Sequence, residues 1–398
     1  MIDETGAEGA EAVEPTRPPD PRRRRKLVAL AVVVALLVLP SRSFAIAMSA
    51  PGDMSPSEKA VEWLRDHGLG SVVNGVQHWW YSSHPPKKGG TPSHRIGVAS
   101  PPGSWQARSV RTHTTVAHTP APADLVSPAA HPVPDEGHWL AVGPRVDGIP
   151  TMYETQIRPD AVHTSILDGL VWMDPKLLRF ALHPGLDEPG GTWTDAPDVP
   201  MDERLALVAA FNGGFRQRDS GGGFYLDGRT AAPLVDGAAS LVIDRDGTAT
   251  VAQWGRDVSM SSDVVAVRQD LHLIVDHGRV VPGLAHNAHD AWGDSVGQDV
   301  LVWRSGVCVD GNGGVIYAYG DGLSAMSLAG ILQRAGCVRA MELDVYPTAT
   351  TFNFYGAVES DNPASVLGAK MLPNQDKPGD RYLSPDSRDF VAVFERRF

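Results

Sequence analysis

Cysteine is scarce in this chain of 398 residues, which contains only two. Two cysteines form at most one bridge, so a scaffold held together by several disulfides is excluded. Positive charge is also limited, because 35 Lys and Arg are outnumbered by 47 Asp and Glu and leave a net charge of −12. This balance argues against a general nucleic-acid-binding protein, and we expect no nucleic-acid partner.

Long apolar runs are few as well, which excludes a multi-span membrane protein. The conspicuous run is Leu27–Leu39, and the basic cluster Arg22–Lys26 stands directly before it. A basic segment before an apolar one stays on the cytoplasmic side of a membrane. We therefore expect residues 1–26 to be a disordered cytoplasmic tail and residues 27–48 to be an uncleaved anchor. The rest of the chain would then be extracellular, attached to the cell membrane by a single span.

The alternative is a cleaved signal peptide and a secreted product. The apolar run is short for a membrane span and has the length typical of a signal-peptide core. The small residues of Ala45-Ile46-Ala47 would suit signal peptidase. Both interpretations place the bulk of the protein outside the cell.

Glycine and proline are abundant, with 41 and 32 residues, or 73 of 398. That share exceeds the roughly 12% of ordinary proteins and indicates many turns and a spacer. Within residues 49–135 we expect one short amphipathic helix, Ser57–His67, capped by Ser55 or Ser57 and ended by Gly68. The remainder of that segment is rich in Pro, Ser and His without periodicity, which is typical of a spacer.

Residues 136–398 read as a folded domain. Asp246-Gly247 joins two strand-like runs as a hairpin, and Ser327–Ala335 reads as a helix capped by Ser327. Helices do not alternate with strands, so we predict a sheet-rich α+β fold with a mixed β domain and few helices. The expected strands are Trp139–Val142, Val162–Leu167, Leu177–Leu182, Leu205–Phe211, Ser240–Asp244, Thr248–Gln253, Leu271–Val275 and Phe390–Phe394.

Two polar motifs directly follow or end apolar runs. Asn212, Gly213 and Gly214 come after the run 205–211, where paired glycines let backbone N–H groups approach a ligand closely. Arg304 and Ser305 follow the apolar residues 300–303. Arginine is suited to bidentate recognition of phosphate or carboxylate, so both motifs are candidates for binding an anion.

A third motif carries two carboxylates. If residues 340–345 form a strand, alternation places Glu342 and Asp344 on one face and their apolar neighbours on the other. Repulsion between two such carboxylates would raise the pKa of one of them, which suits acid–base chemistry. A solvated strand face is the other interpretation of this spacing.

The loop around residues 286–292 offers further polar groups. His272, His277, His286 and His289 match no defined zinc spacing, so we expect no metal there, and no cofactor elsewhere. Asn287 and Asp290 are better candidates for contacts to a substrate. Residues 293–297 match the Gly-x-Ser-x-Gly pattern of serine hydrolases, but the apolar strand and the helix that this motif needs are not evident around it.

These motifs, taken in chain order, resemble the phosphodiester glycosidase family, whose members remove N-acetylglucosamine from phosphodiester-linked glycans. The family shows Asn-Gly-Gly-Phe-Phe after a strand, then Arg-Ser/Thr-x-x-Gly, then a helix leading to a strand that ends Leu-Asp-Gly-Gly-Gly-Ser. Here the corresponding segments are 212–216, 304–308 and 322–344. The resemblance extends over roughly residues 138–398.

Four departures from the family pattern stand out. Arg216 replaces the second phenylalanine, Cys308 replaces the glycine of the arginine motif, and Glu342 replaces an asparagine. The glycine-serine tail is absent, because Asp344 runs into Val-Tyr-Pro-Thr. Arg216 adds positive charge that would help bind an anion.

The resemblance implies hydrolysis of a sugar-1-phosphodiester in a cell-envelope glycan. Asp344 would act as base or nucleophile with Glu342 as its partner, and Arg304 would bind the phosphate with help from Asn212, Gly213 and Gly214. The alternative is an inactive relative that binds cell-wall phosphoglycans without cutting them. Cys308 and Cys337 would lie outside the membrane, where either a disulfide or free thiols are compatible with the sequence.

Overall fold

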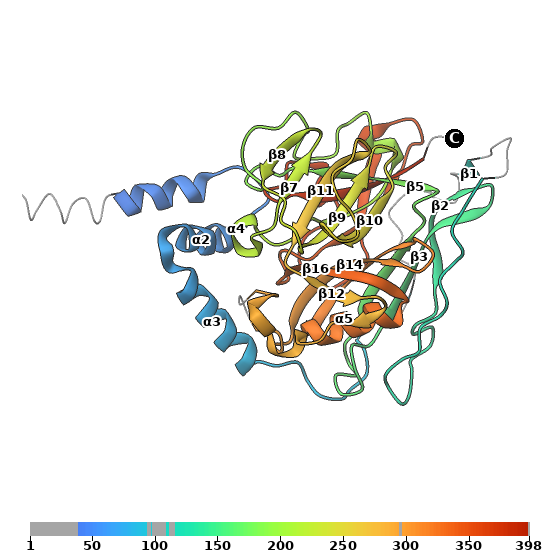
Figure 1. Ribbon diagram of the computed structural model, residues 1–398, viewed down its shortest axis with the longest axis horizontal. Coiled ribbons are helices and arrows are strands. Elements are labelled where there is room, and N and C mark those ends of the chain that lie inside the picture. Colours follow the sequence, from blue (N-terminus) through green and yellow to red (C-terminus); the bar gives the residue numbers. More distant parts are fainter. Residues whose placement is uncertain (1–38, 94–96, 98–108, 111–115, 294–296, 397–398) are drawn as a thin grey trace, which may run out of the picture.

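The computed structural model describes residues 39–93, 97, 109–110, 116–293 and 297–396, whose strands form three sheets (Figure 1). The largest sheet has nine strands, and all its neighbouring pairs are antiparallel except β1 and β2. In spatial order they are β1 (Ser109–Val110), β2 (Leu140–Val146), β3 (Ile149–Ile157), β4 (Asp168–Met173), β15 (Val315–Leu323), β14 (Val302–Asp310), β16 (Cys337–Val345), β12 (Leu273–Asp276) and β13 (Arg279–Val280).

Two five-stranded antiparallel sheets complete the domain. One consists of β18 (Val366–Lys370), β17 (Phe352–Ala357), β6 (Leu207–Asn212), β19 (Phe390–Glu395) and β5 (Leu178–His183). The other consists of β10 (Ala249–Gln253), β9 (Ala239–Asp244), β11 (Val264–Asp270), β7 (Phe224–Leu226) and β8 (Arg229–Ala232).

Helices are few among the described residues. The N-terminal part contains a helix over residues 39–49, α2 (Pro56–Leu64), a π-helical turn (Arg65–Leu69) and α3 (Gly70–Ser83). The domain itself contains α4 (Gln217–Ser220) and α5 (Ala325–Arg334). Short 3-10 turns cover Arg204–Ala206, Leu284–His286, Ala288–Asp290, Pro363–Ser365 and Arg381–Leu383.

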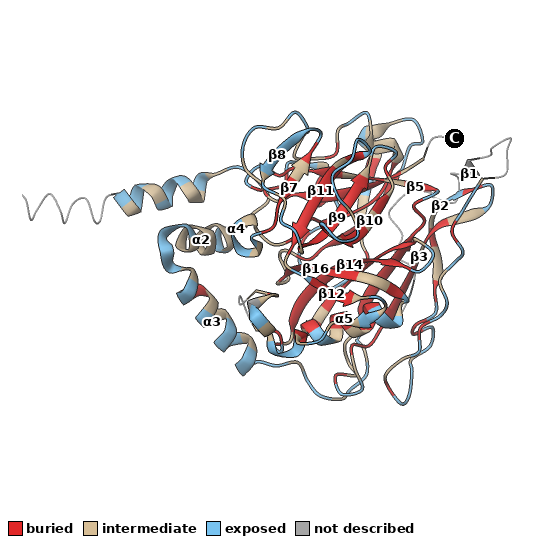
Figure 2. Ribbon diagram, viewed as in Figure 1, coloured by how far each residue is buried: buried red, intermediate tan, exposed pale blue. Residues whose placement is uncertain are grey.

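One apolar core joins the three sheets. Side chains such as Met341 of β16, Phe211 of β6 and Leu241 of β9 are buried in the same cluster. Figure 2 shows these central strands as the buried interior of the domain. Burying large apolar side chains contributes about 1.5–3 kcal/mol each, so this shared core joins the sheets into one unit.

The helix α5 covers the other face of the nine-stranded sheet. Its Leu328, Ile331 and Leu332 pack in a second buried cluster that also contains Cys308 and Cys337. These two cysteines form a disulfide between the neighbouring strands β14 and β16, with Cα atoms 5.8 Å apart. The single bridge that the sequence left open is therefore formed.

The predicted sheet-rich α+β architecture with few helices is confirmed, and the antiparallel pairing agrees with the rejection of a doubly wound sheet. The hairpin at Asp246-Gly247 is formed between β9 and β10. The strand predicted at Val162–Leu167 is wrong, because that segment is irregular and the strand begins at Asp168. The cap of α5 is Ser324 rather than Ser327, which instead completes a capping box as the third helical residue.

The N-terminal helix also differs from its predicted bounds. Ser55 caps α2 in a capping box with Glu58, as one of the two predicted caps. Gly68 does not end the helical segment, because its φ of +79° produces a kink after which α3 begins. Tertiary contacts from the inner face of α3 to the domain explain why the chain resumes a helix there.

Within the described part of the chain, no helix is both long enough and apolar enough to cross a membrane. Most of the predicted anchor, residues 27–38, lies outside the described residues. Its last part, residues 39–48, belongs to the helix over residues 39–49.

Candidate functional site

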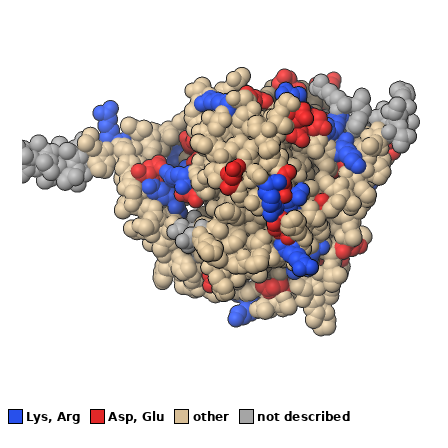
Figure 3. Space-filling model, in the orientation of Figure 1, with Lys and Arg blue, Asp and Glu red and all other residues tan. Residues whose placement is uncertain are grey.

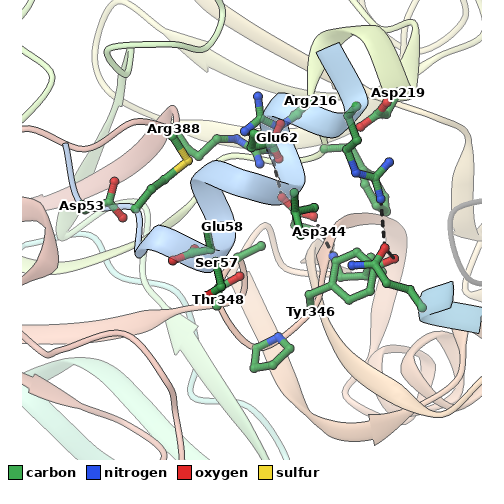
Figure 4. Close-up of a pocket in the computed structure, with 18 of the residues that line it drawn as sticks. Asp53, Ser57, Glu58, Glu62, Arg216, Asp219, Asp344, Tyr346, Thr348 and Arg388 are labelled. Carbon is green, nitrogen blue, oxygen red and sulfur yellow. Dashed lines mark hydrogen bonds and ion pairs between the residues drawn. The ribbon is translucent and has the colours of Figure 1, made fainter. Parts of the chain in front are cut away.

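A cavity of about 270 Å³ lies where the end of β16 meets α2, the loop after β6 and the segment before β19 (Figure 4). Its wall contains Asp344, Arg216 and Arg388 from the domain and Glu62 from α2. Of the residues proposed from the sequence, Asp344 and Arg216 are therefore brought together at one cavity. Arg388 and Glu62 were not anticipated.

Asp344 is the buried carboxylate at this cavity. Its Oδ2 accepts a hydrogen bond of 3.0 Å from Arg388 Nη2, and its Oδ1 accepts one of 2.8 Å from the backbone N–H of Val345. Burial raises the pKa of Asp344 to about 6, and the favourable charge of Arg388 offsets this only in part. A carboxyl group with such a pKa exchanges protons near neutral pH, which is a property common at catalytic sites.

Ser305 holds the backbone of Asp344. The Ser305 hydroxyl accepts from the N–H of Asp344 at 3.2 Å and donates to its carbonyl at 3.3 Å. It also accepts at 3.1 Å from Nδ2 of Asn212. Ser305 is fully buried, so it positions Asp344 from behind the cavity.

The amide of Asn212 is used inside the protein. Its Oδ1 accepts from the Tyr317 hydroxyl at 2.6 Å and from the Thr351 N–H at 3.2 Å. With the bond to Ser305, the side chain ties β6 to β14, β15 and the start of β17. Asn212 therefore orders the framework behind Asp344.

Gly213 and Gly214 allow two carboxylates to approach the loop. A Cβ on Gly213 would lie 2.0 Å from Asp389 Oδ2, and one on Gly214 would lie 2.2 Å from Asp270 Oδ2. Such distances are impossible for real atoms, so these positions require glycine because of space. The loop then continues to Phe215, whose N–H donates to Asp270 Oδ2 at 2.9 Å.

A buried ionic cluster supports this loop. Arg268 is completely buried, and its Nε donates to Asp389 Oδ2 at 2.8 Å. Burial is the main cause that raises the pKa of Asp270 well above its ordinary value, and the nearby Arg268 lowers it only in part. The sequence carried no local signal for this cluster, because Arg268 and Asp389 lie 121 positions apart.

Arg388 links the loop to Asp344. Its Nη2 donates at 2.6 Å to the carbonyl of Gly214 as well as to Asp344. Arg388 stands in the polar segment 386–389, directly before the apolar strand β19. That position was the available sequence signal, since polar residues at a strand end often gather at a site.

Arg304 and Glu342 form a separate buried pair. Arg304 Nη1 donates to Glu342 Oε1 at 2.6 Å, and its other nitrogens donate to the carbonyls of Leu323, Gly297 and Val300. Among the described residues, the wall of the 270 Å³ cavity includes neither of them. Arg304 instead borders a small space of about 20 Å³ beside Phe215 and Val345.

The loop that carries Asn287 and Asp290 is held by its own bonds. Asn287 donates from Nδ2 to the carbonyl of Gly293 at 2.7 Å and accepts from the N–H of Trp292 at 2.8 Å. Asp290 ends the 3-10 turn Ala288–Asp290. Residues 294–296, which include the serine of the Gly-x-Ser-x-Gly match, lie outside the described residues.

The N-terminal helix α2 forms one side of the cavity through ion pairs. Glu62 lies 2.9 Å from Arg216, and Lys377 lies 3.1 Å from both Glu58 and Asp53. In Figure 3, acidic and basic side chains lie side by side where α2 meets the domain. Burial raises the pKa of Glu62, and Arg216 counteracts that rise only in part.

Tyr346 completes the wall next to Asp344. Its φ is +79°, a conformation that favours glycine, at a position where the resembled family has its glycine run. The backbone N–H of Tyr346 donates to the carbonyl of Trp303 at 2.9 Å, and its hydroxyl donates to Gln77 of α3 at 2.9 Å. The ring also stacks on Tyr81. The turn is thus kept without glycine by contacts to β14 and α3.

Four arginines and five carboxyl groups line the cavity, and Arg388 and Arg216 are the two wall arginines whose charge acts on Asp344. A guanidinium group can bind two phosphate oxygens at once. A carboxylate of pKa near 6 can accept a proton or attack an electrophilic carbon. The arrangement is suited to an anionic substrate with a reacting centre beside Asp344.

One comparison with known protein families agrees with this chemistry. Residues 206–345 match the family model described as phosphodiester glycosidase. A search of curated proteins found no match. The match supports a glycosidase-type activity in general.

Three solved structures are similar to this chain. The catalytic domain of zebrafish N-acetylglucosamine-1-phosphodiester alpha-N-acetylglucosaminidase, auto-inhibited by pro-peptide, is 17% identical with a TM-score of 0.40, over 62% of this chain and 84% of that one. A hypothetical protein from Synechocystis is 14% identical with a TM-score of 0.38, over 63% of each chain. A putative exported protein from Burkholderia pseudomallei is 12% identical with a TM-score of 0.31, over 57% of this chain and 74% of that one.

The family match covers the loop after β6, the strand β14 with Arg304 and Ser305, and β16 up to Val345. These are the segments whose motifs carried the resemblance in the sequence. Residues 206–345 of this chain thus match the phosphodiester glycosidase family, and the resemblance is confirmed.

Proposed function

We propose that the protein hydrolyses a sugar-1-phosphodiester at the cavity of Asp344. The observation that carries this proposal is the position of Asp344, buried at the cavity and 3.0 Å from Arg388 with a pKa of about 6. Arg388 and Arg216 are the cations that would hold the phosphate. In this proposal they take the role first expected for Arg304, whose guanidinium is engaged by Glu342 and three carbonyls.

The reaction breaks the bond between the anomeric carbon and the phosphate oxygen. The phosphate monoester leaves as an anion with the bonding electrons, so it needs little protonation, and the two arginines stabilise its charge. The sugar passes through an oxocarbenium-like state. Asp344 then serves either as a base that takes a proton from the attacking water or as a nucleophile that forms a glycosyl ester, which water hydrolyses.

Glu342 would contribute by holding the framework. Its ion pair with Arg304 joins β14 and β16, the strands that carry Ser305 and Asp344. In this proposal Glu342 is a positioning residue, although the sequence placed it as the direct partner of Asp344. Asn212 and Ser305 act in the same way, through the backbone of Asp344.

We also propose that the substrate is a cell-envelope glycan met outside the cell. The support is the basic cluster Arg22–Lys26 before the apolar run Leu27–Leu39, which favours a single membrane span with the domain outside. A secreted form is the alternative to this anchored one, and both expose the cavity to envelope glycans.

A protein that binds phosphoglycans without cutting them is the second candidate. The observation in its favour is that Tyr346 stands at the chain position of the family's glycine tail, while α2 lines the same cavity as Asp344. Product formation separates the two candidates, because both would bind the same anion.

The test uses the full chain with an N-acetylglucosamine-1-phosphodiester and measures released N-acetylglucosamine. The Asp344→Asn variant should lose about 10²–10⁴-fold in rate, the usual contribution of an acid–base group. Asp219→Asn is a matched control, since Asp219 is another carboxylate of the cavity wall. Binding without release would favour the second candidate, and equal loss in both variants would contradict the role of Asp344.

A further inference from the structure

The outward face of α3 is apolar and exposed. Its large side chains Leu69, Val72, Val76, Trp79 and Trp80 are between 42% and 62% exposed, with Leu69 directly preceding the helix. Isolated exposed apolar residues are ordinary, but five on one short segment form a patch that marks an interaction surface.

These five residues form one stripe. At about 100° per residue, they lie within roughly 100° of the helix circumference. The side that faces the domain carries Gln77 and Tyr81, which contact Tyr346, and the buried Val73 lies at the boundary between this side and the stripe. The stripe therefore points away from the domain, as the position of α3 at its margin in Figures 1 and 2 also shows.

The charge of this part of the chain identifies the partner. The sequence of α3 contains no Asp, Glu, Lys or Arg, and the surface over it is uncharged in Figure 3. Two exposed lysines, Lys87 and Lys88, follow the helix by four and five residues. An apolar stripe that contains no charged residue and is followed by two exposed lysines is complementary to an anionic lipid surface.

The chain before α3 supports the same partner. The apolar run Leu27–Leu39 leads into the helix over residues 39–49, where Leu39, Phe44 and Ile46 are exposed. In Figure 1 this helix and α3 lie on the same side of the domain. Tryptophan side chains also favour the interface between lipid and water, where the ring meets acyl chains and the N–H meets headgroups.

We propose that the stripe of Leu69, Val72, Val76, Trp79 and Trp80 docks on the surface of an anionic bilayer. The helix would lie in the plane of the interface with its inner face on the domain. Because that inner face contacts Tyr346 beside Asp344, docking would hold the cavity about one helix diameter, roughly 10 Å, from the lipid.

The test measures tryptophan fluorescence of the full chain reconstituted in vesicles of phosphatidylglycerol and phosphatidylcholine with brominated acyl chains. Bromine quenches tryptophans that touch the acyl region. The Trp79→Ser/Trp80→Ser variant should lose most of the lipid-dependent quenching. The Trp193→Ser variant is the matched control and should keep it, because Trp193 packs on Phe224 and Arg229 of the domain.

Two results would overturn the proposal. Equal quenching in wild type and the double variant would mean that Trp79 and Trp80 do not touch lipid. The second result is a wild-type protein that is a dimer in detergent and a Val72→Ser/Val76→Ser variant that is a monomer. It would mean that a second copy covers the stripe. Circular dichroism and the unfolding temperature of each variant exclude a loss of folding as the cause, and the assay does not depend on hydrolase activity.

Discussion

Two carboxylates of β16, Glu342 and Asp344, each pair with an arginine, and the two pairs have different surroundings. Glu342 pairs with Arg304 at 2.6 Å, with both side chains at most 2% exposed. Asp344 pairs with Arg388 at 3.0 Å, with side chains 9% and 17% exposed at the edge of a cavity. The same two chemical groups therefore serve as an internal brace in one case and as an accessible charge pair in the other.

The difference lies in how completely each guanidinium is used. Arg304 donates to Glu342 and to three carbonyls of the protein, so an added anion would have to displace these partners. Arg388 donates to Asp344 and to the carbonyl of Gly214, and it borders the cavity together with Arg216. A pair at a cavity can exchange a partner for substrate, whereas a pair sealed on all sides contributes mainly to stability.

The largest effect is expected when one member of the sealed pair is removed. Arg304→Met should lower the free energy of unfolding by about 3–5 kcal/mol, because Glu342 would keep a buried charge without its cation. Urea titration followed by circular dichroism measures this change. The double variant Arg304→Met/Glu342→Leu should recover much of the lost free energy of unfolding. A double variant as unstable as the single one would contradict a stabilising role of the Arg304–Glu342 pair.

The pair at the cavity should make stability depend on pH. The carboxyl of Asp344 ionises near 3.8 in the unfolded chain and near 6 in the folded protein, because burial raises its pKa. Between these values the folded state binds more protons, so the stability contributed by Asp344 falls as pH rises and is about 3 kcal/mol lower above pH 6.

Asp344→Asn removes this dependence. The free energy of unfolding of the variant minus that of the wild type should therefore increase by about 2 kcal/mol between pH 4 and pH 7. Urea titrations at four pH values in that range measure the difference. A constant difference would show that the carboxyl of Asp344 titrates alike in both states.

Arg388→Met should shift the pH profile of hydrolysis. The positive charge of Arg388 lowers the pKa of Asp344 against the larger effect of burial, so its removal should move the acidic limb of the profile upward by about one pH unit. Initial rates from pH 5 to 8 measure the shift. Arg339→Met, an arginine of β16 away from the cavity wall, is the control and should leave the midpoint in place.

The smallest effect is expected for Glu62 of α2. Its carboxylate pairs with Arg216 and Arg218, so it competes with an anionic substrate for these cations. Glu62→Gln should lower KM a few-fold, equivalent to about 1 kcal/mol or less, with little change in kcat. Asp66→Asn, which removes a more exposed partner of Arg218, is the control. A raised KM in Glu62→Gln would instead mean that Glu62 helps to bind the substrate.

Local patterns predicted much of the framework correctly. Alternation along residues 340–345 placed Met341 and Leu343 in the apolar core and the two carboxylates together on the other face. Local patterns also predicted the Asp246-Gly247 hairpin and the helix α5, because turns and helix caps depend on a few neighbouring residues. The interpretation of the carboxylate face as solvated is wrong, since both side chains are buried.

The ion-pair partners within the site could not be predicted from local patterns. Arg304 follows an apolar run just as an anion-binding arginine would, and only the register of β14 against β16 brings it to Glu342. Arg388 reaches Asp344 across 44 positions of sequence. The helix α2 was predicted from its sequence pattern, but its docking on the cavity wall through Asp53, Glu58 and Glu62 was not.

Local sequence patterns predicted most strands and turns and placed Asp344 near the end of an apolar strand. The ordered motifs also match the phosphodiester glycosidase family over residues 206–345. These features follow from hydrophobic periodicity and from short-range backbone preferences, which neighbouring residues specify. Tertiary structure alone decided which arginine faces the cavity, which carboxylate is sealed, and that α2 forms part of the wall. Those outcomes depend on long-range packing, because burial and the nearest opposite charge, rather than residue type, determine what a charged group can do.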